Sequence, residues 1–361
     1  MRVYDLAVVG AGPAGSTAAR YAARRSLKVV LLEKRKEVGV PVQCGEYVAA
    51  NPEVVSLFPT VRDLDDLMEV PMQCREGDTP IIRIYSPKGR QYDVPFRGYS
   101  VRRDRMDQGI ADQAVSEGAE LRRSTAVIGV SGTRVRTDHG DLEAKVVIGA
   151  DGPRSRVARS VGLPWPASAP AMSTVYDGTF DDITHMYFGR LAPGGYAWVI
   201  PKKGCANVGL GTWQHFQGRL DTLFTVFTDR LGLPRRHGTG GYVPVTGPLD
   251  RTVAGNVLLA GDAAGHVMAT NGGGINVAMI CGRIAAETAA DHVQKGVPLG
   301  EYEKRWRGAV GGPLTQGARI KRLADRFFGN DRLLEVSMRL LGARRMERAI
   351  RCQPLFLPRA A

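Results

Sequence analysis

Apolar residues near the start of the chain fall into two short runs, separated by a glycine-rich turn and an alanine-rich stretch. The first run covers residues 6–9, and the second covers 28–32. Between them, residues 14–25 have the spacing of a helix that packs on a sheet. Strand, helix and strand within about 30 residues predict a parallel βαβ unit.

The pattern then becomes less regular. Residues 41–100 are rich in proline, glycine and charge, and they predict loops with short strands. Residues 103–118 predict a helix, and strands are expected near 119–129, 133–136 and 142–149. The last of these ends in an apolar run, as a buried parallel strand does.

A turn-rich region over 165–250 contains alternating strands, such as 196–200 and 206–210, which are typical of an antiparallel sheet. Buried-strand character returns at 257–260, a helix is expected over 273–292, and the remainder predicts further helices. We therefore predict an α/β fold in which a parallel-sheet domain is interrupted by an antiparallel-sheet domain and followed by a helical C-terminus.

The composition is that of a globular protein, with 43% hydrophobic and 24% charged residues among 361. No apolar run approaches the roughly 18 residues of a membrane-spanning helix, and the N-terminus lacks the pattern of a cleaved signal peptide. Five scattered cysteines form no CxxC pair and no metal-ligand spacing, so neither a disulfide framework nor a metal site is predicted. We expect a soluble, cytoplasmic protein.

The net charge of +13 is concentrated at the C-terminal end. Residues 301–361 hold 14 Lys and Arg against 6 Asp and Glu, which accounts for +8. Apolar residues at helical spacing predict a basic amphipathic helix, which could lie at the inner face of an anionic membrane or attract an anionic substrate. The alternative is a solvated helix face packed on the body of the protein. Nucleic-acid binding is not predicted, because no aromatic-basic module accompanies the charge, and the oligomeric state is left open.

The turn after the first strand has the spacing GxGxxG. Gly10 permits the tight bend, Gly12 lets the backbone approach a pyrophosphate, and Gly15 allows the helix to pack closely on the strand. Glu33 ends the second strand, where a carboxylate can accept hydrogen bonds from a ribose 2′-hydroxyl. The motif predicts a bound dinucleotide, and NAD alone would satisfy it.

Two later features favour FAD. One strand ends in Asp151-Gly152 and another in Gly261-Asp262, and in flavoproteins of the hydroxylase/reductase superfamily the latter aspartate contacts the ribityl chain. The glycines at 272–274 then open a helix whose positive end can face the flavin pyrimidine. We predict a Rossmann-type FAD-binding domain of this superfamily, with an inserted antiparallel-sheet substrate domain. The expected divisions are 1–75, 101–165 and 251–295 for the FAD-binding domain, 76–100 and 166–250 for the substrate domain, and 296–361 for the basic helical C-terminal region.

With these motifs in place, the chain resembles the geranylgeranyl reductases, especially the archaeal enzymes that saturate digeranylgeranylglycerophospholipids. The likeness covers most of the chain. The segments that carry it are 33–35, 41–46, 103–104, 193–201, 206–209 and 261–264.

The segment PxxYxWxFP is the most specific mark of that family and, by the resemblance, lines the pocket for the prenyl chain. Tyr196, Trp198 and Pro201 match it as substrate-binding residues, whereas Ile200 replaces the usual phenylalanine. Tyr196 and Trp198 are two apart on a strand, so both side chains project to the same face. The alternative is that they are ordinary core aromatics.

By the same resemblance, the loop that contains Cys44 passes the flavin ring. We expect Cys44 to contact the cofactor and to serve in catalysis, by donating a proton to the alkene or by polarising it, or in a redox role. The resemblance and the motifs together predict the following cofactor-binding residues: Gly10, Gly12, Ala14, Gly15, Glu33, Cys44, Gly45, Arg103, Ala126, Asp262, Gly273, Gly274 and Ile275.

One region departs from the family pattern. Met268 and Ala269 stand where related archaeal reductases have an Asp-Pro pair before the glycine turn, and His266 and Asn271 are the polar residues nearby. His266 could supply the proton, or it could be a buried histidine that is hydrogen-bonded to the backbone.

The resemblance implies an FAD-dependent reductase that saturates isolated C=C bonds of geranylgeranyl chains, with archaeal-type phospholipids as substrate. The sequence contains no second complete GxGxxG, so NADPH would bind transiently or a small redox carrier would deliver the electrons. The alternatives are an FAD-dependent aromatic hydroxylase of the same superfamily and a non-catalytic prenyl-binding protein. The loop at 41–46 and the Tyr196/Trp198 strand argue against the hydroxylase, and the intact cofactor motifs argue against the binding protein.

Overall fold

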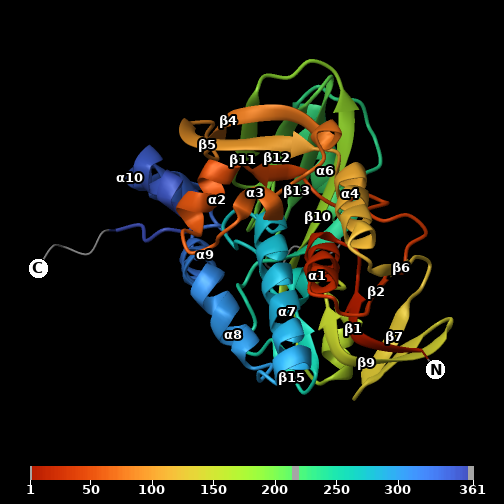
Figure 1. Cartoon of the computed structure of the whole chain (residues 1–361). Helices are drawn as coiled ribbons and strands as arrows, with labels where there is room; N and C mark the ends of the chain where they lie inside the picture. Colours follow the sequence, from red (N-terminus) through yellow and green to blue (C-terminus); the bar gives the residue numbers. More distant parts are fainter. Residues whose placement is uncertain (1, 214–218, 357–361) are drawn as a thin grey trace, which may run out of the picture.

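The fold is built on two eight-stranded sheets, shown in Figure 1. The computed structural model describes residues 2–213 and 219–356. Residue 1, residues 214–218 and residues 357–361, which belong to the predicted cofactor, substrate and C-terminal regions respectively, lie outside the described residues. The domain boundaries expected from the sequence remain an interpretation.

The first sheet contains the predicted βαβ unit. Its central strands are parallel in the order β16-β9-β1-β2-β6, and an antiparallel hairpin joins it through β8. Leu6 of β1 pairs with Val29 on one side and Val146 on the other. The strands are β1 (Val3–Val9), β2 (Val29–Leu32), β6 (Glu120–Arg122), β7 (Val127–Ser131), β8 (Arg134–Thr137), β9 (Gly140–Gly149), β15 (Val253–Ala254) and β16 (Val257–Leu259).

Alternate residues of β1 face two different hydrophobic clusters. Leu6 and Val8 belong to the cluster of α1 and α7, whereas Ala7 and Val9 belong to the cluster of the β7–β8 hairpin. The strand is therefore apolar on both faces, which explains its continuous apolar run. The helices that accompany this sheet are α1 (Pro13–Arg24), α4 (Arg103–Ser116), α5 (Arg156–Ser160) and α7 (Ile275–Lys295).

The second sheet has the order β14-β10-β13-β12-β11-β4-β5-β3 and is antiparallel except for the parallel pair of β4 and β11. Its strands are β3 (Tyr47–Ala49), β4 (Arg75–Tyr85), β5 (Gln91–Val101), β10 (Ser168–Asp177), β11 (Ile183–Tyr187), β12 (Tyr196–Lys202), β13 (Cys205–Gly211) and β14 (Thr239–Pro244). Helix α6 (Leu220–Arg230) covers one face, where Phe224 and Phe227 pack on Val199 and Val208.

The expectation of loops with only short strands over 41–100 was wrong, because β4 and β5 are each 11 residues long. In β5 the side chains alternate between buried and exposed, with Tyr92, Val94 and Phe96 buried. Pro95 occupies an exposed position in this strand and Gly98 a buried one. These two residues and the many charges made a regular period-two pattern resemble a loop.

The C-terminal part is helical, as predicted. Helices α8 (Glu301–Trp306), a π-helical turn at Arg307–Gly311, α9 (Gly312–Ala324) and α10 (Asp331–Ile350) lead from the first sheet to the edge of the second, where α10 contacts β5 (Figure 1). Within the ranges that the structure covers, no helix combines the length and the apolar character needed to cross a bilayer.

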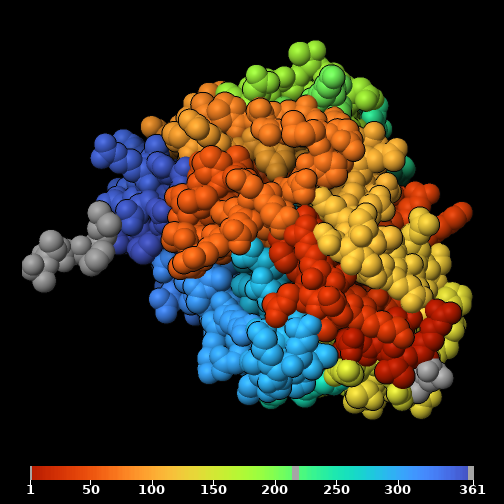
Figure 2. Space-filling view, in the orientation of Figure 1, coloured from red at the N-terminus to blue at the C-terminus, as the bar shows by residue number. Residues whose placement is uncertain are grey.

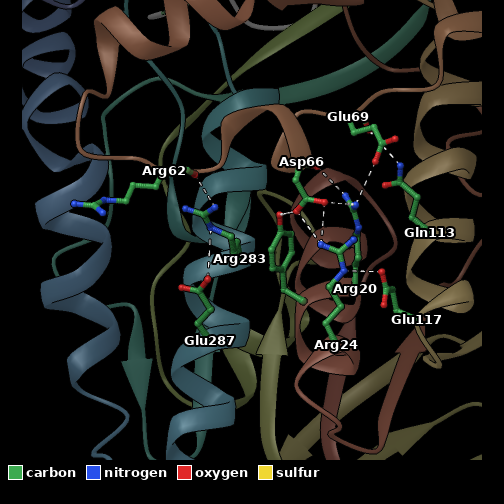
Figure 3. Close-up of polar contacts among 10 residues, drawn as sticks. Arg20, Arg24, Arg62, Asp66, Glu69, Gln113, Glu117, Arg283 and Glu287 are labelled. Atoms are coloured by element: carbon green, nitrogen blue, oxygen red, sulfur yellow. Dashed lines mark hydrogen bonds and ion pairs between the residues drawn. The ribbon is translucent and has the colours of Figure 1, made fainter.

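The short helix α3 (Leu64–Leu67) is bound to α1 through one carboxylate (Figure 3), and α2 (Asn51–Leu57) contacts α3. Asp66 accepts hydrogen bonds from Arg20 at 2.9 Å, from Arg24 at 2.8 Å and from the Tyr21 hydroxyl. Burial would raise the pKa of Asp66, but its bonds to Arg24 and Tyr21 hold that pKa below its ordinary value. These hydrogen bonds matter for the site because residues 54, 57 and 58 of the adjoining segment line the cavity described next.

Candidate active site

One cavity of about 410 Å³ lies between the two sheets and is bordered by residues from both. This volume is within the usual range for small-molecule and cofactor sites. Most of the predicted site residues meet here although they come from six separate segments. Those that line the cavity are Gly12, Ala14, Cys44, Gly45, Arg103, Tyr196, Trp198, Asp262, Gly273, Gly274 and Ile275.

Two helices begin at this cavity with their amide groups uncovered. Helices α1 and α7 each have a glycine as N-cap, with no side-chain cap and no acidic residue in the first turn. A Cβ built on Gly12 would meet no protein atom within 4 Å, so the space beside the turn is open to a ligand. Uncovered amides and the positive end of the helix dipole bind anionic groups. The two N-termini therefore fit a pyrophosphate at α1 and an electron-rich flavin ring at α7.

Gly10 and Gly15 support this turn from behind. A Cβ on Gly15 would lie 1.8 Å from the carbonyl oxygen of Gly10, and Gly10 itself has φ +97°. Neither residue borders the cavity. Their role in the structure is to let strand, turn and helix approach one another closely.

Glu33 and Ala126 also lie outside the lining of the cavity. The Glu33 carboxylate accepts the amide of Ala11 at 2.8 Å and that of Arg35 at 2.9 Å, so it braces the glycine turn. Each of its oxygens still has acceptor capacity for a ribose hydroxyl. Ala126 exchanges backbone and side-chain hydrogen bonds with Asp138 at the start of the β7 hairpin.

Asp262 faces the cavity just after β16. Its carboxylate receives no hydrogen bond from the described residues, and burial, opposed by Arg103, raises its pKa to about 6. A carboxylate with free acceptor positions fits the ribityl hydroxyls expected from the sequence.

Asp151 differs, because its carboxylate is hydrogen-bonded within the protein. It accepts the Ser155 hydroxyl at 2.6 Å and the amide of Arg156 at 2.7 Å, and so caps α5.

Arg103 supplies a fixed positive charge to the cavity. Its guanidinium forms a bidentate pair with Asp107, with distances of 3.0 and 2.9 Å. Burial would lower the pKa of Arg103, but Asp107 and then Cys44 keep it above the ordinary value. The arginine is therefore always charged and is held rigidly on α4.

The Cys44 loop is held by a buried polar cluster that the sequence reasoning missed. Glu46 Oε2 accepts Lys202 Nζ at 2.8 Å and Asn207 Nδ2 at 3.0 Å, and its Oε1 accepts the Arg103 amide at 3.1 Å. The same Asn207 amide donates to the Cys44 carbonyl at 2.9 Å. Asn207 Oδ1 in turn accepts the Trp198 indole N–H at 2.9 Å. Glu46 and Asn207 lie in two of the segments that resemble the family, but they are far apart in the sequence and no spacing rule connects them. The one indication in the sequence was a polar residue, Asn207, within an otherwise apolar strand.

Aromatic side chains form one wall of the cavity. The rings of Tyr196 and Trp198 are 5.9 Å apart, and Phe188 lies 5.8 Å from Tyr196. Tyr196 donates its hydroxyl proton to the Asn271 carbonyl, and burial keeps its pKa above the ordinary value. Pro201, predicted with this pair, lies on the opposite face of β12 and does not border the cavity. Strand alternation explains this, since Pro201 is an odd number of residues from both aromatics.

The lining of the cavity differs in character from place to place. Val54, Leu57 and Phe58 are buried and contribute apolar groups to it. The lining also contains the buried Lys321 together with the half-buried Phe328. The glycine turn, an apolar surface and one ammonium group therefore border the same cavity.

The polar residues near Met268 and Ala269, where the sequence departs from the family pattern, contact other parts of the protein. Asn271 Oδ1 accepts the Gly273 amide at 2.8 Å, and its Nδ2 donates to the Ile350 carbonyl at 2.9 Å, which ties the turn to α10. His266 is fully buried against Trp306, with ring centroids 4.6 Å apart, and burial followed by Arg307 lowers its pKa to about 3. It does not border the cavity and is neutral at physiological pH, so it is no proton donor. The alternative prediction, a buried histidine that is hydrogen-bonded to the backbone, is also wrong, because neither ring nitrogen of His266 has a hydrogen-bond partner in the described part of the chain.

Replacing Gly12 by alanine should separate cofactor binding from folding. Gly12 has φ −78°, which alanine adopts freely, and its Cβ would meet only ligand space. We expect Gly12→Ala to keep its free energy of unfolding within about 1 kcal/mol of wild type and to bind FAD at least tenfold more weakly. Gly15→Ala is the matched variant, because its Cβ collides with the turn and should destabilise the fold by about 3 kcal/mol or more. Urea unfolding and flavin titration measure both quantities; equal FAD affinity in Gly12→Ala and wild type would contradict a pyrophosphate at this turn.

Asp262 should make the stability of the flavin-free protein depend on pH. Because its pKa of about 6 lies above the ordinary 3.8, protonation favours the folded state at low pH, and that contribution is lost as pH rises through 6. Asp262→Asn should therefore be more stable than wild type by about 1–2 kcal/mol at pH 8 and nearly equal at about pH 3, below the ordinary pKa of the carboxyl, with the shift discounted for cavity water. It should also bind FAD at least tenfold more weakly. Urea unfolding at both pH values tests this, with the exposed Asp112→Asn as control; parallel pH profiles would rule it out.

Known proteins similar to this chain agree with the geometry. Residues 170–230 match the family model of the geranylgeranyl reductase catalytic domain, and residues 8–59 match that of an NAD(P)-binding Rossmann-like domain. A flavin-dependent brominase of 20% identity, with a TM-score of 0.68 over 90% of this chain and 89% of the brominase, shares the fold alone.

Closer relatives share the sequence as well. A digeranylgeranylglycerophospholipid reductase of Methanothrix thermoacetophila is 35% identical over 91% of this chain and 89% of the relative, and one of Methanothermobacter thermautotrophicus is 35% identical over 89% and 88%. A solved geranylgeranyl bacteriochlorophyll reductase-like structure from Thermoplasma acidophilum has a TM-score of 0.81 and 29% identity over 93% of this chain and 90% of that one. This chain belongs to the geranylgeranyl reductase family.

Proposed function

We propose that the protein is an FAD-dependent reductase that saturates isolated C=C bonds in the geranylgeranyl chains of archaeal-type membrane phospholipids. The observation that carries this is the cavity between the sheets, where the glycine turn and Asp262 adjoin an apolar surface with an aromatic wall. The reductases of Methanothrix and Methanothermobacter are named for this substrate class. Reduced FAD, when bound, supplies the hydride for the alkene.

The residues of the chain have to orient the alkene and exclude water. An isolated alkene is a poor hydride acceptor, so holding the bond close to the donor in a dry site provides much of the rate. Tyr196 and Trp198 offer flat apolar surfaces for an isoprenoid, and their polar atoms are already hydrogen-bonded to Asn271 and Asn207. They can therefore contact the chain without leaving a donor unpaired.

We assign the apolar tail of the substrate to the lining at Leu57 and Phe58, and the polar head to the lining at Lys321. The Lys321 ammonium pairs with Asp325 and lies 5.5 Å from the centres of the Trp213 and Phe328 rings. Burial lowers the pKa of Lys321, although Asp325 opposes this. An anionic head group would compensate for that burial.

Cys44 is our candidate for the proton donor. Its Sγ accepts the Glu46 amide at 3.1 Å, which leaves the thiol proton free to point into the cavity. Arg103 and the polar cluster around Glu46 hold the loop in place.

The electrons come, in this proposal, from NADPH or a small redox carrier. The basic C-terminal region brings the protein to the membrane that holds its substrate.

The main alternative, an aromatic hydroxylase, shares the fold but requires O₂. The proposed reaction should instead proceed anaerobically: the protein, reduced with dithionite under nitrogen and given a digeranylgeranyl phospholipid, should yield product heavier by two hydrogens for each double bond reduced. Mass spectrometry of the lipid measures this gain. No gain with any prenyl lipid would refute the proposal. Turnover of an aromatic substrate only in air would establish the hydroxylase, and prenyl binding by a protein that takes up no FAD would establish the binding protein.

Cys44→Ser should lower kcat at least tenfold at saturating FAD, because a hydroxyl is a much weaker acid than a thiol and general acids contribute about 10²-fold or more. Flavin content and the free energy of unfolding should stay at wild-type values. Cys205→Ser, a half-buried cysteine outside the cavity, is the matched control. A Cys44→Ser enzyme with weaker FAD binding and unchanged kcat would show that Cys44 is only a cofactor contact.

A further inference from the structure

Helix α10 presents an apolar row to solvent. Leu333, Val336 and Leu340 follow one another at helical spacing and are 51%, 55% and 73% exposed. The opposite face already contributes Leu334 and Met338 to the core. The helix is thus apolar on two faces, and only one of them is covered by the described chain.

Basic residues flank this row without internal partners. Arg332 and Arg339 lie on the same helical stretch as this row, and Arg344 follows just beyond the kink of α10 at Gly342. All three are exposed, and none forms an ion pair within the described residues. The arginines and the apolar row together are called the outer face of α10 below.

Each acidic residue of the same helix has a basic partner. Glu335 accepts the Lys88 amide at 3.1 Å and lies 3.9 Å from Arg90, and Glu347 pairs with Arg351 at 2.8 Å. The remaining acid, Asp331, lies 4.0 Å from Arg190. The outer face is therefore uniformly positive as well as apolar.

The base of the helix adjoins the cavity. Phe328, three residues before α10, lines the cavity and stacks on Phe188 with ring centroids 6.0 Å apart. Figure 2 shows α10 at the left edge of the molecule, standing out from the body beside the segment of α2. A surface against which α10 rests would thus be close to the Phe328 end of the cavity.

We propose that the outer face of α10 docks on an anionic lipid bilayer, with Leu333, Val336 and Leu340 among the acyl chains and the arginines on the lipid phosphates. A row of large apolar residues flanked by cations matches a helix lying in the plane of a membrane interface. Uncompensated arginines complement a surface of negative charge. The docked helix holds the Phe328 end of the cavity at the bilayer, from which the prenyl chain enters; this last step alone rests on the proposed function.

Vesicle sedimentation of the full chain tests the docking directly. Wild type should bind vesicles of phosphatidylcholine with phosphatidylglycerol and bind pure phosphatidylcholine much more weakly. Arg332→Gln/Arg339→Gln/Arg344→Gln should lower the partition coefficient on the mixed vesicles about 100-fold, since each cation contributes about fivefold near such a surface. Leu333→Ser/Leu340→Ser should lower it at least tenfold on the mixed vesicles.

The control removes three exposed cations elsewhere. Arg136, Lys203 and Arg251 lie outside the C-terminal helices, and Arg136→Gln/Lys203→Gln/Arg251→Gln should change the partition coefficient less than threefold. Thermal unfolding confirms that each variant is folded. In detergent with a dispersed prenyl substrate, the α10 variants should keep wild-type kcat, whereas with substrate in vesicles their rate should fall.

The outcomes separate docking from the proposed reaction. Loss of binding in both α10 variants supports docking even if no prenyl lipid is reduced, because sedimentation does not depend on activity. Vesicle binding that is equal in wild type and variants overturns it. If wild type forms a dimer that Leu333→Ser/Leu340→Ser dissociates, and neither protein binds vesicles, the outer face is an interface between two copies and the proposal fails.

Discussion

The cavity depends on one buried carboxylate, that of Glu46. It joins the Cys44 loop to β12 through Lys202, to β13 through Asn207 and to the start of α4 through the Arg103 amide. Both members of the Glu46–Lys202 pair are almost fully buried, at 4% and 5% exposure. Removing one partner of such a pair costs about 3–5 kcal/mol, because the other charge stays buried and unpaired. Glu46 also has φ 64°, a conformation that costs about 1–3 kcal/mol for a residue other than glycine. The cluster offsets this strain, so the position of Cys44 and the cohesion of the two sheets have a common origin.

The cofactor half of the site could be predicted from sequence because its determinants are local. The turn from Gly10 to Gly15 specifies its own geometry within six residues, and the flanking apolar runs specify the parallel strands. The same holds for Tyr196 and Trp198, whose shared face follows from strand alternation alone. By the same alternation Pro201 projects to the opposite face of β12, so this residue matches the family motif but does not border the cavity.

What could not be predicted depends on contacts between distant segments. Glu46, Lys202 and Asn207 are up to 161 positions apart, and no spacing rule connects them. His266 could not be assessed either, since its neutrality follows from burial against Trp306, which is 40 positions away. The long strand β5 was missed for a different reason. Its exposed positions carry charged residues and a proline, so the overall composition of the segment suggested a loop. The alternation of buried and exposed positions, taken alone, would have predicted the strand.

A comparison of four polar groups at the cavity supports the proposal that Cys44 supplies the proton. Arg103 is bound to Asp107 and stays charged, and the Tyr196 hydroxyl donates to the Asn271 carbonyl. Asp262, with a pKa of about 6, is mostly ionised at neutral pH and so has no proton to give. At the glycine turn near Asn271, Met268 and Ala269 replace the Asp-Pro pair of related archaeal reductases, so this turn supplies no carboxylic acid. The Cys44 side chain donates no hydrogen bond to the described residues, and the loop that carries it is the one that Glu46 holds in place. In the proposed mechanism the proton comes from the Cys44 loop, so the reaction does not require an acid at the glycine turn.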